Sequence, residues 1–165
     1  MQDVSAFGTT ISILATQSFP IGFTVNKFAD DKDPLKIEDI EATGYEFLID
    51  GSLFIFDKAA VIKVQVAVIA ASEDDINFKT MLMSRKGSSG VLGLPDVTTM
   101  TISYGNGGVV VFTNGSIVSG PLGDSIEQSG RHPSNTYTFV FSDFAGAQSV
   151  SEVVNTALNA IAGLF

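Results

Sequence analysis

The residue best suited to acid–base or metal chemistry is the single histidine, His132, which lies in the sequence Gly-Arg-His-Pro. Any Ser-His-Asp relay or histidine-ligated metal would have to use this residue. A histidine in a polar turn before proline is common, and no serine or carboxylate is fixed against it by spacing. Cysteine is absent, which excludes thiolate chemistry and Cys-based zinc sites. The sequence therefore predicts a protein without enzymatic activity, metal or cofactor.

An acidic stretch over residues 29–34 is a second candidate for chemistry. Asp30, Asp31 and Asp33 resemble part of a calcium loop, but the glycine and the distant closing glutamate of that loop are missing. We therefore expect a solvated turn that ends at Pro34.

A further group of carboxylates follows in residues 35–44, which are charged and only weakly periodic. Glu38, Asp39 and Glu41 invite a general acid–base interpretation. Nothing in the sequence places them in a pocket, so an exposed acidic face is the expected outcome. The stretch could be a strand end, a long loop or a projecting arm.

Composition bounds the class of protein. The 165-residue chain has 18 acidic and 9 basic residues, a net charge of −9, and only two arginines, Arg85 and Arg131. Such a chain is poorly suited to binding nucleic acid through phosphate neutralisation. Charged residues make up only 16% of the chain and mean hydropathy is +0.31, which fits a self-associating protein or a compact apolar monomer. We expect neither a signal peptide nor a transmembrane helix.

Alternating apolar residues predict several β-strands, and the clearest group lies in residues 45–70. Two apolar runs meet at Asp50-Gly51, which predicts a hairpin with a two-residue type I′ turn. The third run, residues 61–70, predicts a strand with one buried face. We expect the rest of the chain to be organised around this sheet. Further strands are predicted in residues 9–16, 19–28, 96–104, 109–113 and 137–142, with another turn at Asn114-Gly115.

Two segments have helical periodicity. Ser72 and Asp75 form a capping box at the start of a helix over residues 72–86, whose apolar side should close one face or an open end of a sandwich. A loop rich in glycine and serine follows in residues 87–95. Residues 149–163 predict a C-terminal helix with a wide apolar stripe, which must dock on its own sheet or on a neighbour. The sequence thus predicts a mainly β (α+β) protein, sandwich-like or barrel-like, with two helices.

Two long segments are similar to a known family. DVSAFGTTISILATQSFPIGFTVNKFADDKDPL and TTMTISYGNGGVVVFTNGSIVSGPLGDSIEQSGRHPSNTYTFVFSD resemble tail tube proteins of tailed bacteriophages, and the resemblance runs over residues 3–144. It implies a β-sandwich-like subunit with a flanking helix, in a single domain over residues 1–165. Six copies would form a ring whose sheets join into a β-barrel, and stacked rings would conduct DNA through an acidic lumen without specific binding. No catalytic residues come with this family.

The resemblance also implies partners and a location. They are further copies of the chain, the sheath, the baseplate initiator, the tape measure and the terminator, all in the virion tail after synthesis in the host cytoplasm. We expect contacts between subunits or rings to involve the acidic loop, the acidic stretch after it and the C-terminal helix. The residues concerned are Asp30, Asp31, Asp33, Pro34, Glu38, Asp39, Glu41, Val150, Val154, Leu158 and Ile161.

Two other functions fit the same pattern. One is the tube of a related contractile injection or secretion system. The other is a carbohydrate-binding or receptor-binding β-sandwich on a virion, which would need an exposed aromatic platform. The chain has no tryptophan, and most of its 13 phenylalanines stand at strand positions expected to face a core.

Overall fold

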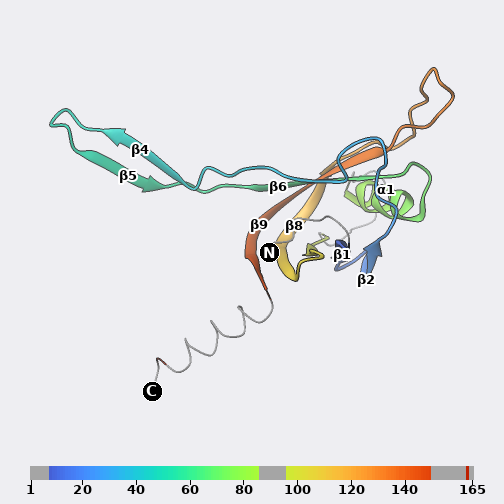
Figure 1. Ribbon diagram of the computed structural model, residues 1–165, viewed down its shortest axis with the longest axis horizontal. Coiled ribbons are helices and arrows are strands. Elements are labelled where there is room, and N and C mark those ends of the chain that lie inside the picture. Colours follow the sequence, from blue (N-terminus) through green and yellow to red (C-terminus); the bar gives the residue numbers. More distant parts are fainter. Residues whose placement is uncertain (1–7, 86–95, 150–162, 164–165) are drawn as a thin grey trace.

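A computed structural model describes residues 8–85, 96–149 and 163 of the chain. Within them, one helix and nine strands follow the order β1 to β6, α1, β7 to β9 (Figure 1). Their bounds are β1 Thr10–Ala15, β2 Phe19–Val25, β3 Leu35–Ile37, β4 Thr43–Phe47, β5 Leu53–Asp57, β6 Ile62–Val68, α1 Glu73–Arg85, β7 Thr98–Ser103, β8 Gly108–Ser119 and β9 Asn135–Ser149. The fold is therefore mainly β, as predicted.

Seven strands form one antiparallel sheet in the order β2-β1-β7-β8-β9-β6-β3. The sheet is open, because β2 and β3 each have one neighbour in it. An isolated bridge between Phe28 and Val68 links the chain after β2 to the end of β6. In the part of the chain that the structure describes, the strands thus curl around a core without closing into a barrel.

The core forms because apolar residues alternate along the central strands. β1 and β7 each bury every second residue, and β6 buries Ile62, Val64, Val66 and Val68, as its alternation predicted. Aromatic rings fill the centre, where Phe78 of α1 lies 5.1 Å from Tyr137 and 5.5 Å from Phe139, ring centre to ring centre. The helix is therefore fixed to the sheet by aromatic packing.

The predicted helix is confirmed as α1, and the Ser72 hydroxyl accepts a hydrogen bond from the Asp75 amide at 3.2 Å. Its predicted apolar side is only partly correct. Phe78 and Met81 are buried, but Ile76 and Met83 are exposed. The helix instead turns two acidic residues of its first turn inward, where other groups of the chain bind them.

Three expectations about strands were wrong. Of the runs in residues 45–70, only the third joins the main sheet as β6, whereas β4 and β5 pair in a separate two-stranded sheet. Asn114-Gly115 is no turn, because β8 continues through it to Ser119 with a register shift and a positive φ at Asn114. The last strand is also longer than predicted and runs from Asn135 to Ser149. The predicted loop of residues 87–95 and nearly all of the predicted C-terminal helix lie outside the described residues.

Candidate functional site

The β4–β5 hairpin, hereafter the arm, projects from the body along the long axis of the molecule (Figure 1). It begins after residues 38–42 and ends where the chain enters β6. Its base is held by a hydrogen bond from the Lys58 amide to the Ala42 carbonyl at 2.9 Å and by an ion pair between Lys58 and Glu41 at 3.0 Å. The acidic stretch of residues 38–41 thus includes the point where the arm leaves the body.

The tip of the arm is a three-residue loop, Ile49-Asp50-Gly51, and not the predicted two-residue turn. The Leu48 and Ser52 backbones pair at 2.9 Å, and the Gly51 amide donates to the Leu48 carbonyl. Of the three loop residues, Gly51 alone has a positive φ, which is 84°. A type I′ turn would need a positive φ at Asp50 as well. This geometry is that of a type I turn followed by a left-handed glycine.

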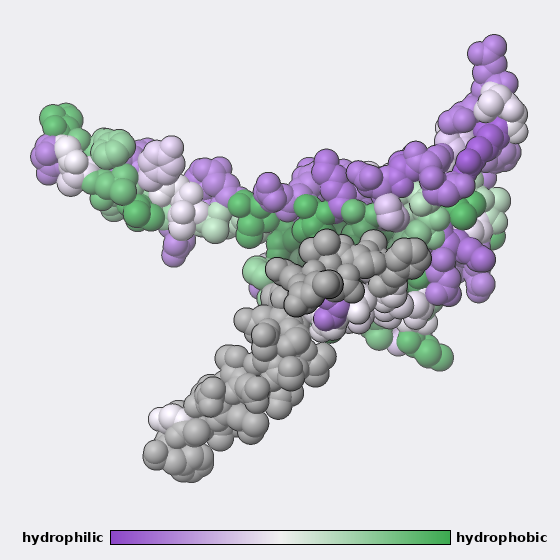
Figure 2. Space-filling model, viewed as in Figure 1, coloured by the Kyte–Doolittle hydropathy of each residue, from purple (hydrophilic) through white to green (hydrophobic). Residues whose placement is uncertain are grey.

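Both faces of the arm are apolar and exposed. On one face Tyr45 pairs with Ile55 and Phe47 with Leu53, and on the other Phe54 lies 6.0 Å from Phe56, ring centre to ring centre. Tyr45 is 70% exposed and Phe47 is 73% exposed. Figure 2 shows this apolar surface at the end of the molecule, away from the core.

A surface of this kind marks an interaction site for two reasons. Contiguous exposed apolar patches are uncommon on monomeric proteins. A two-stranded hairpin alone is also marginally stable in water, and it needs a third strand or another layer to cover its apolar face. Within the described residues β4 and β5 pair only with each other, which makes the arm the candidate interaction surface.

The predicted contact residues of the acidic loop bind other parts of the same chain. Arg131 forms an ion pair with Asp30, and the Ser134 amide donates to Asp31 at 3.3 Å. The contact with Ser134 lowers the pKa of Asp31. The Pro34 carbonyl accepts a hydrogen bond from the Ala67 amide at 2.9 Å. These contacts fasten the loop to the body and leave its role between subunits a prediction.

The remaining predicted contact residues are not brought together. Glu38 accepts a hydrogen bond from Gln65 at 3.4 Å, Asp39 is exposed, and Asp33 is exposed on the loop before β3. Four of the predicted contact residues belong to the C-terminal segment and lie outside the described residues: Val150, Val154, Leu158 and Ile161.

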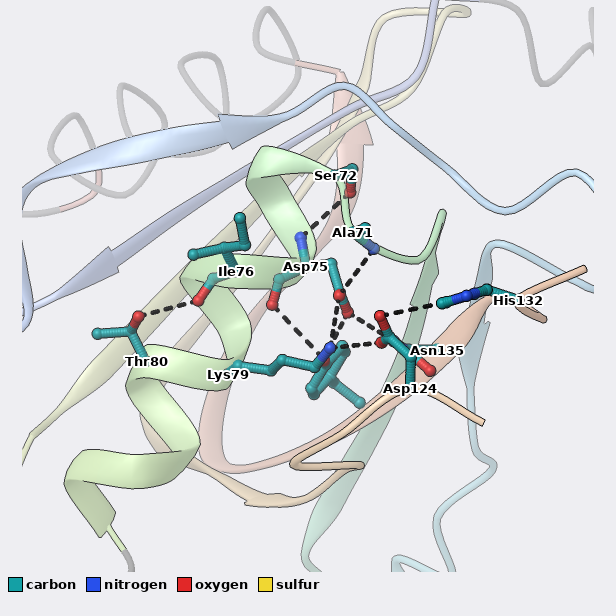
Figure 3. A network of polar contacts seen from close by, with 10 residues as sticks. Ala71, Ser72, Asp75, Ile76, Lys79, Thr80, Asp124, His132 and Asn135 are labelled. Atoms are coloured by element: carbon teal, nitrogen blue, oxygen red, sulfur yellow. Dashed lines mark hydrogen bonds and ion pairs between the residues drawn. The ribbon is translucent and has the colours of Figure 1, made fainter. Parts of the chain in front are cut away.

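A buried polar network lies at the start of α1 (Figure 3). The Asp75 carboxylate accepts hydrogen bonds from Tyr137 at 2.6 Å, Asn135 at 2.9 Å, Lys79 at 2.8 Å and the Ala71 amide at 3.1 Å. Although burial opposes ionisation, these hydrogen bonds lower the pKa of Asp75. Because every oxygen of this carboxylate is engaged, the network joins α1 to β9 and is poorly suited to bind a substrate.

Asp124 extends this network to the loop between β8 and β9. It accepts hydrogen bonds from Lys79 at 2.5 Å and from Asn135 at 2.8 Å, and these lower its pKa to about 2. His132 lies 3.5 Å from Asp124 and its side chain is 50% exposed. The histidine thus stands at the edge of a structural network, opposite a carboxylate that already binds a lysine.

The described residues contain no group of three or more His, Asp or Glu side chains placed to hold a metal ion. None of their helices has the length and apolar character needed to cross a membrane.

The fold is shared with two solved assemblies. A chain in the cryo-EM structure of an extracellular contractile injection system, the PVC sheath/tube terminator in its extended state, matches with a TM-score of 0.51 at 14% identity, over 88% of this chain and 96% of that chain. A chain in the 6-fold symmetrised cryo-EM structure of the anti-feeding prophage (AFP) baseplate matches with a TM-score of 0.51 at 10% identity, over 88% of this chain and 95% of that chain.

Sequence comparison gives a family. No curated protein sequence matches the chain. The profile of a phage tail-related family, described as Tail fiber protein gp32, matches residues 2–145, which is most of the chain. The protein therefore belongs to the Tail fiber protein gp32 family.

Proposed function

We propose that the protein is a structural subunit of a phage tail tube, in which copies of the chain form rings and the rings stack into a conduit for DNA. The observation that carries this proposal is the arm, which exposes apolar side chains on both faces and has no partner within the main sheet. Self-association would cover these side chains in every copy. The family supports a place in the tail particle.

The shared fold adds support for a ring. One similar chain comes from an extracellular contractile injection system with a sheath/tube terminator, and the other comes from the 6-fold symmetrised baseplate of the anti-feeding prophage. A six-fold ring of this chain would have a strongly acidic character, because each copy has a net charge of −9. An acidic wall repels DNA and so favours passage over binding. A tube of a related contractile injection system would follow the same reasoning.

The test is electron microscopy and sedimentation of the purified protein at high concentration. We expect the wild type to form rings or tubes, and a Phe47→Ser, Ile55→Ser double variant to remain monomeric because the arm loses its apolar face. Ile126→Ser is the control, since the Ile126 side chain is about as exposed as that of Phe47 but lies in the loop between β8 and β9. Monomers from the wild type, or rings from the arm variant, would refute the proposal.

A second candidate is a receptor-binding or carbohydrate-binding module of the tail. Two observations favour it: the family description names a tail fibre, and the arm exposes aromatic rings that the sequence had not led us to expect, Tyr45 and Phe47 on one face and Phe54 on the other. A monomeric wild type that binds a glycan, and that loses binding in the arm variant, would favour this function.

We also propose that the protein has no catalytic role. The supporting observation is that His132 is exposed and lies beside a network whose hydrogen bonds are already satisfied. Equal hydrolase activity of the wild type and His132→Ala, or none in either, is the expected result.

A further inference from the structure

A second apolar surface lies beside α1, which Figure 1 shows on the side of the body away from the arm. It is a groove of about 440 Å³, lined by Leu82 and Arg85 of α1 and by Ile117, Val118 and Leu122 at the end of β8 and just beyond it. We call it the Arg85 groove. Val118 is 49% exposed and Leu122 is 50% exposed, so its apolar wall is open to a ligand.

Among the described residues that line the groove, Arg85 is the one cation and none is an acid. Arg85 is exposed, and it forms no ion pair or side-chain hydrogen bond within the described residues. The other arginine, Arg131, is already paired with Asp30. In a chain with twice as many acidic as basic residues, an exposed arginine without a carboxylate partner is a favourable place for an acidic ligand.

The arm has the complementary character. Its residues 43–57 include three acidic side chains, Glu46, Asp50 and Asp57, and no lysine or arginine. Asp50 is engaged by Ser52 within the tip. Glu46 lies in the middle of β4, is exposed, and has no ion pair within the described residues. An acidic, apolar arm and a cationic, apolar groove are matched in both charge and polarity.

We propose that the Arg85 groove receives the arm of a second copy of the chain, with Glu46 of one copy paired to Arg85 of the next. This inference rests on the proposed function and names the surface that the arm binds. A contact between opposite sides of two copies is heterologous, and repetition of such a contact generates a ring or a stack. The arm of a copy projects away from its own groove, so the partner must be another molecule (Figure 1).

Another apolar hollow fits the arm less well. It has a volume of about 280 Å³ and is lined by Ile37, Ile40, Tyr104 and Phe144, with Glu38 beside them. Glu38 would stand close to the acidic side chains of a docked arm and repel them, because like charges brought together in an interface cost free energy. Charge therefore favours the Arg85 groove as the acceptor.

Charge reversal tests the pairing. We expect Glu46→Arg and Arg85→Glu each to lower the apparent association constant at least tenfold, measured by sedimentation velocity. The double variant should return to within about threefold of the wild type, because the pair is restored with reversed sign. Glu127→Arg is the matched control, since it changes the net charge by the same amount as Glu46→Arg on an exposed loop. It should leave association within about twofold of the wild type.

Crosslinking gives an independent measurement in a chain that has no native cysteine. A Glu46→Cys variant mixed with a Val118→Cys variant should form a disulfide-linked dimer under mild oxidation, because a docked arm brings the two positions together. Glu127→Cys mixed with Glu46→Cys should not.

The outcomes separate the two proposals. If the wild type assembles and the Phe47→Ser, Ile55→Ser variant does not, the proposed function stands. If, in that case, the double charge reversal fails to restore association and the Glu46–Val118 crosslink is absent, the Arg85 groove is not the acceptor. A wild type that stays monomeric would overturn both.

Discussion

The carboxylates of the polar network, buried Asp75 and partly buried Asp124, determine how the stability of the body responds to acid. Asp75 and Asp124 share Lys79 and Asn135 as hydrogen-bond donors, and both carboxylates have a lowered pKa. Burial and the neighbouring Asp75 raise the pKa of Tyr137, so its hydroxyl remains a donor at any ordinary pH. The ionised carboxylates thus hold α1, the loop after β8 and β9 together.

This network predicts a loss of stability in acid. The folded pKa of Asp124 is about 2 and its reference value is 3.8, so the stabilisation is present above pH 4 and is lost as pH falls through the folded pKa. Urea unfolding between about pH 6 and pH 2 should show the free energy of unfolding falling below about pH 4, by at most about 1.4 kcal/mol per pH unit for each such group. Asp124→Asn should reduce this slope. A wild-type profile that stays flat below pH 4 would contradict the assignment.

At the scale of elements, the sequence correctly predicted the strands in which apolar and polar residues alternate. β1, β6 and β7 bury every second residue, and the capping signals of α1 mark its true start. The arm was misplaced because a continuous apolar run shows that a surface must be covered, without showing whether the same chain covers it. The sequence does contain one signal for the interface role that we propose, namely that both faces of a short hairpin are apolar.

Other features depend on partners distant in sequence. The dipeptide Asn114-Gly115 is typical of a turn when only its neighbours in sequence are considered. In the structure β9 pairs with residues on both sides of Asn114, and the segment is therefore part of β8. The carboxylates of the acidic loop were correctly expected in a turn, but their partners Arg131 and Ser134 lie about a hundred residues away. The spacing of residues within a short segment does not show which distant residues that segment will contact.

The irregularity in β8 gives a prediction at this scale. A Cβ on Gly115 would lie 2.2 Å from the Val140 carbonyl oxygen and 2.3 Å from the Phe141 ring. Gly115→Ala should therefore lower the free energy of unfolding by about 2–4 kcal/mol, because backbone of β9 cannot move aside without breaking pairing. Gly123→Ala is the control, since nothing lies within 4 Å of the added Cβ. Equal stability of the two variants in urea would show that the strands adjust freely.

At the scale of the whole molecule, charge and apolar surface oppose each other. Each copy has a net charge of −9, which opposes self-association, whereas the exposed apolar side chains of the arm would favour it. The free edges of the main sheet are poor sites for strand addition, because β2 contains Pro20 and β3 has only three residues. In the proposed assembly the arm is therefore the main contact.

We expect salt to strengthen association. Raising NaCl from about 0.02 M to about 0.5 M shortens the range of repulsion between acidic copies from roughly 20 Å to below 5 Å, while apolar burial is little affected. Sedimentation velocity should show a larger assembled fraction at high salt. Dissociation at high salt would mean that ion pairs, and not the apolar faces of the arm, dominate the interface.

The order of the strands along the chain also sets an order in time. The arm is complete once residue 57 has been made, but β1 waits for β7, and β8 waits for β9, which ends at Ser149. Pairing across such separations is slow. The Arg85 groove includes the end of β8. In the proposed assembly, a growing chain therefore has the residues of its arm before it has those of its groove.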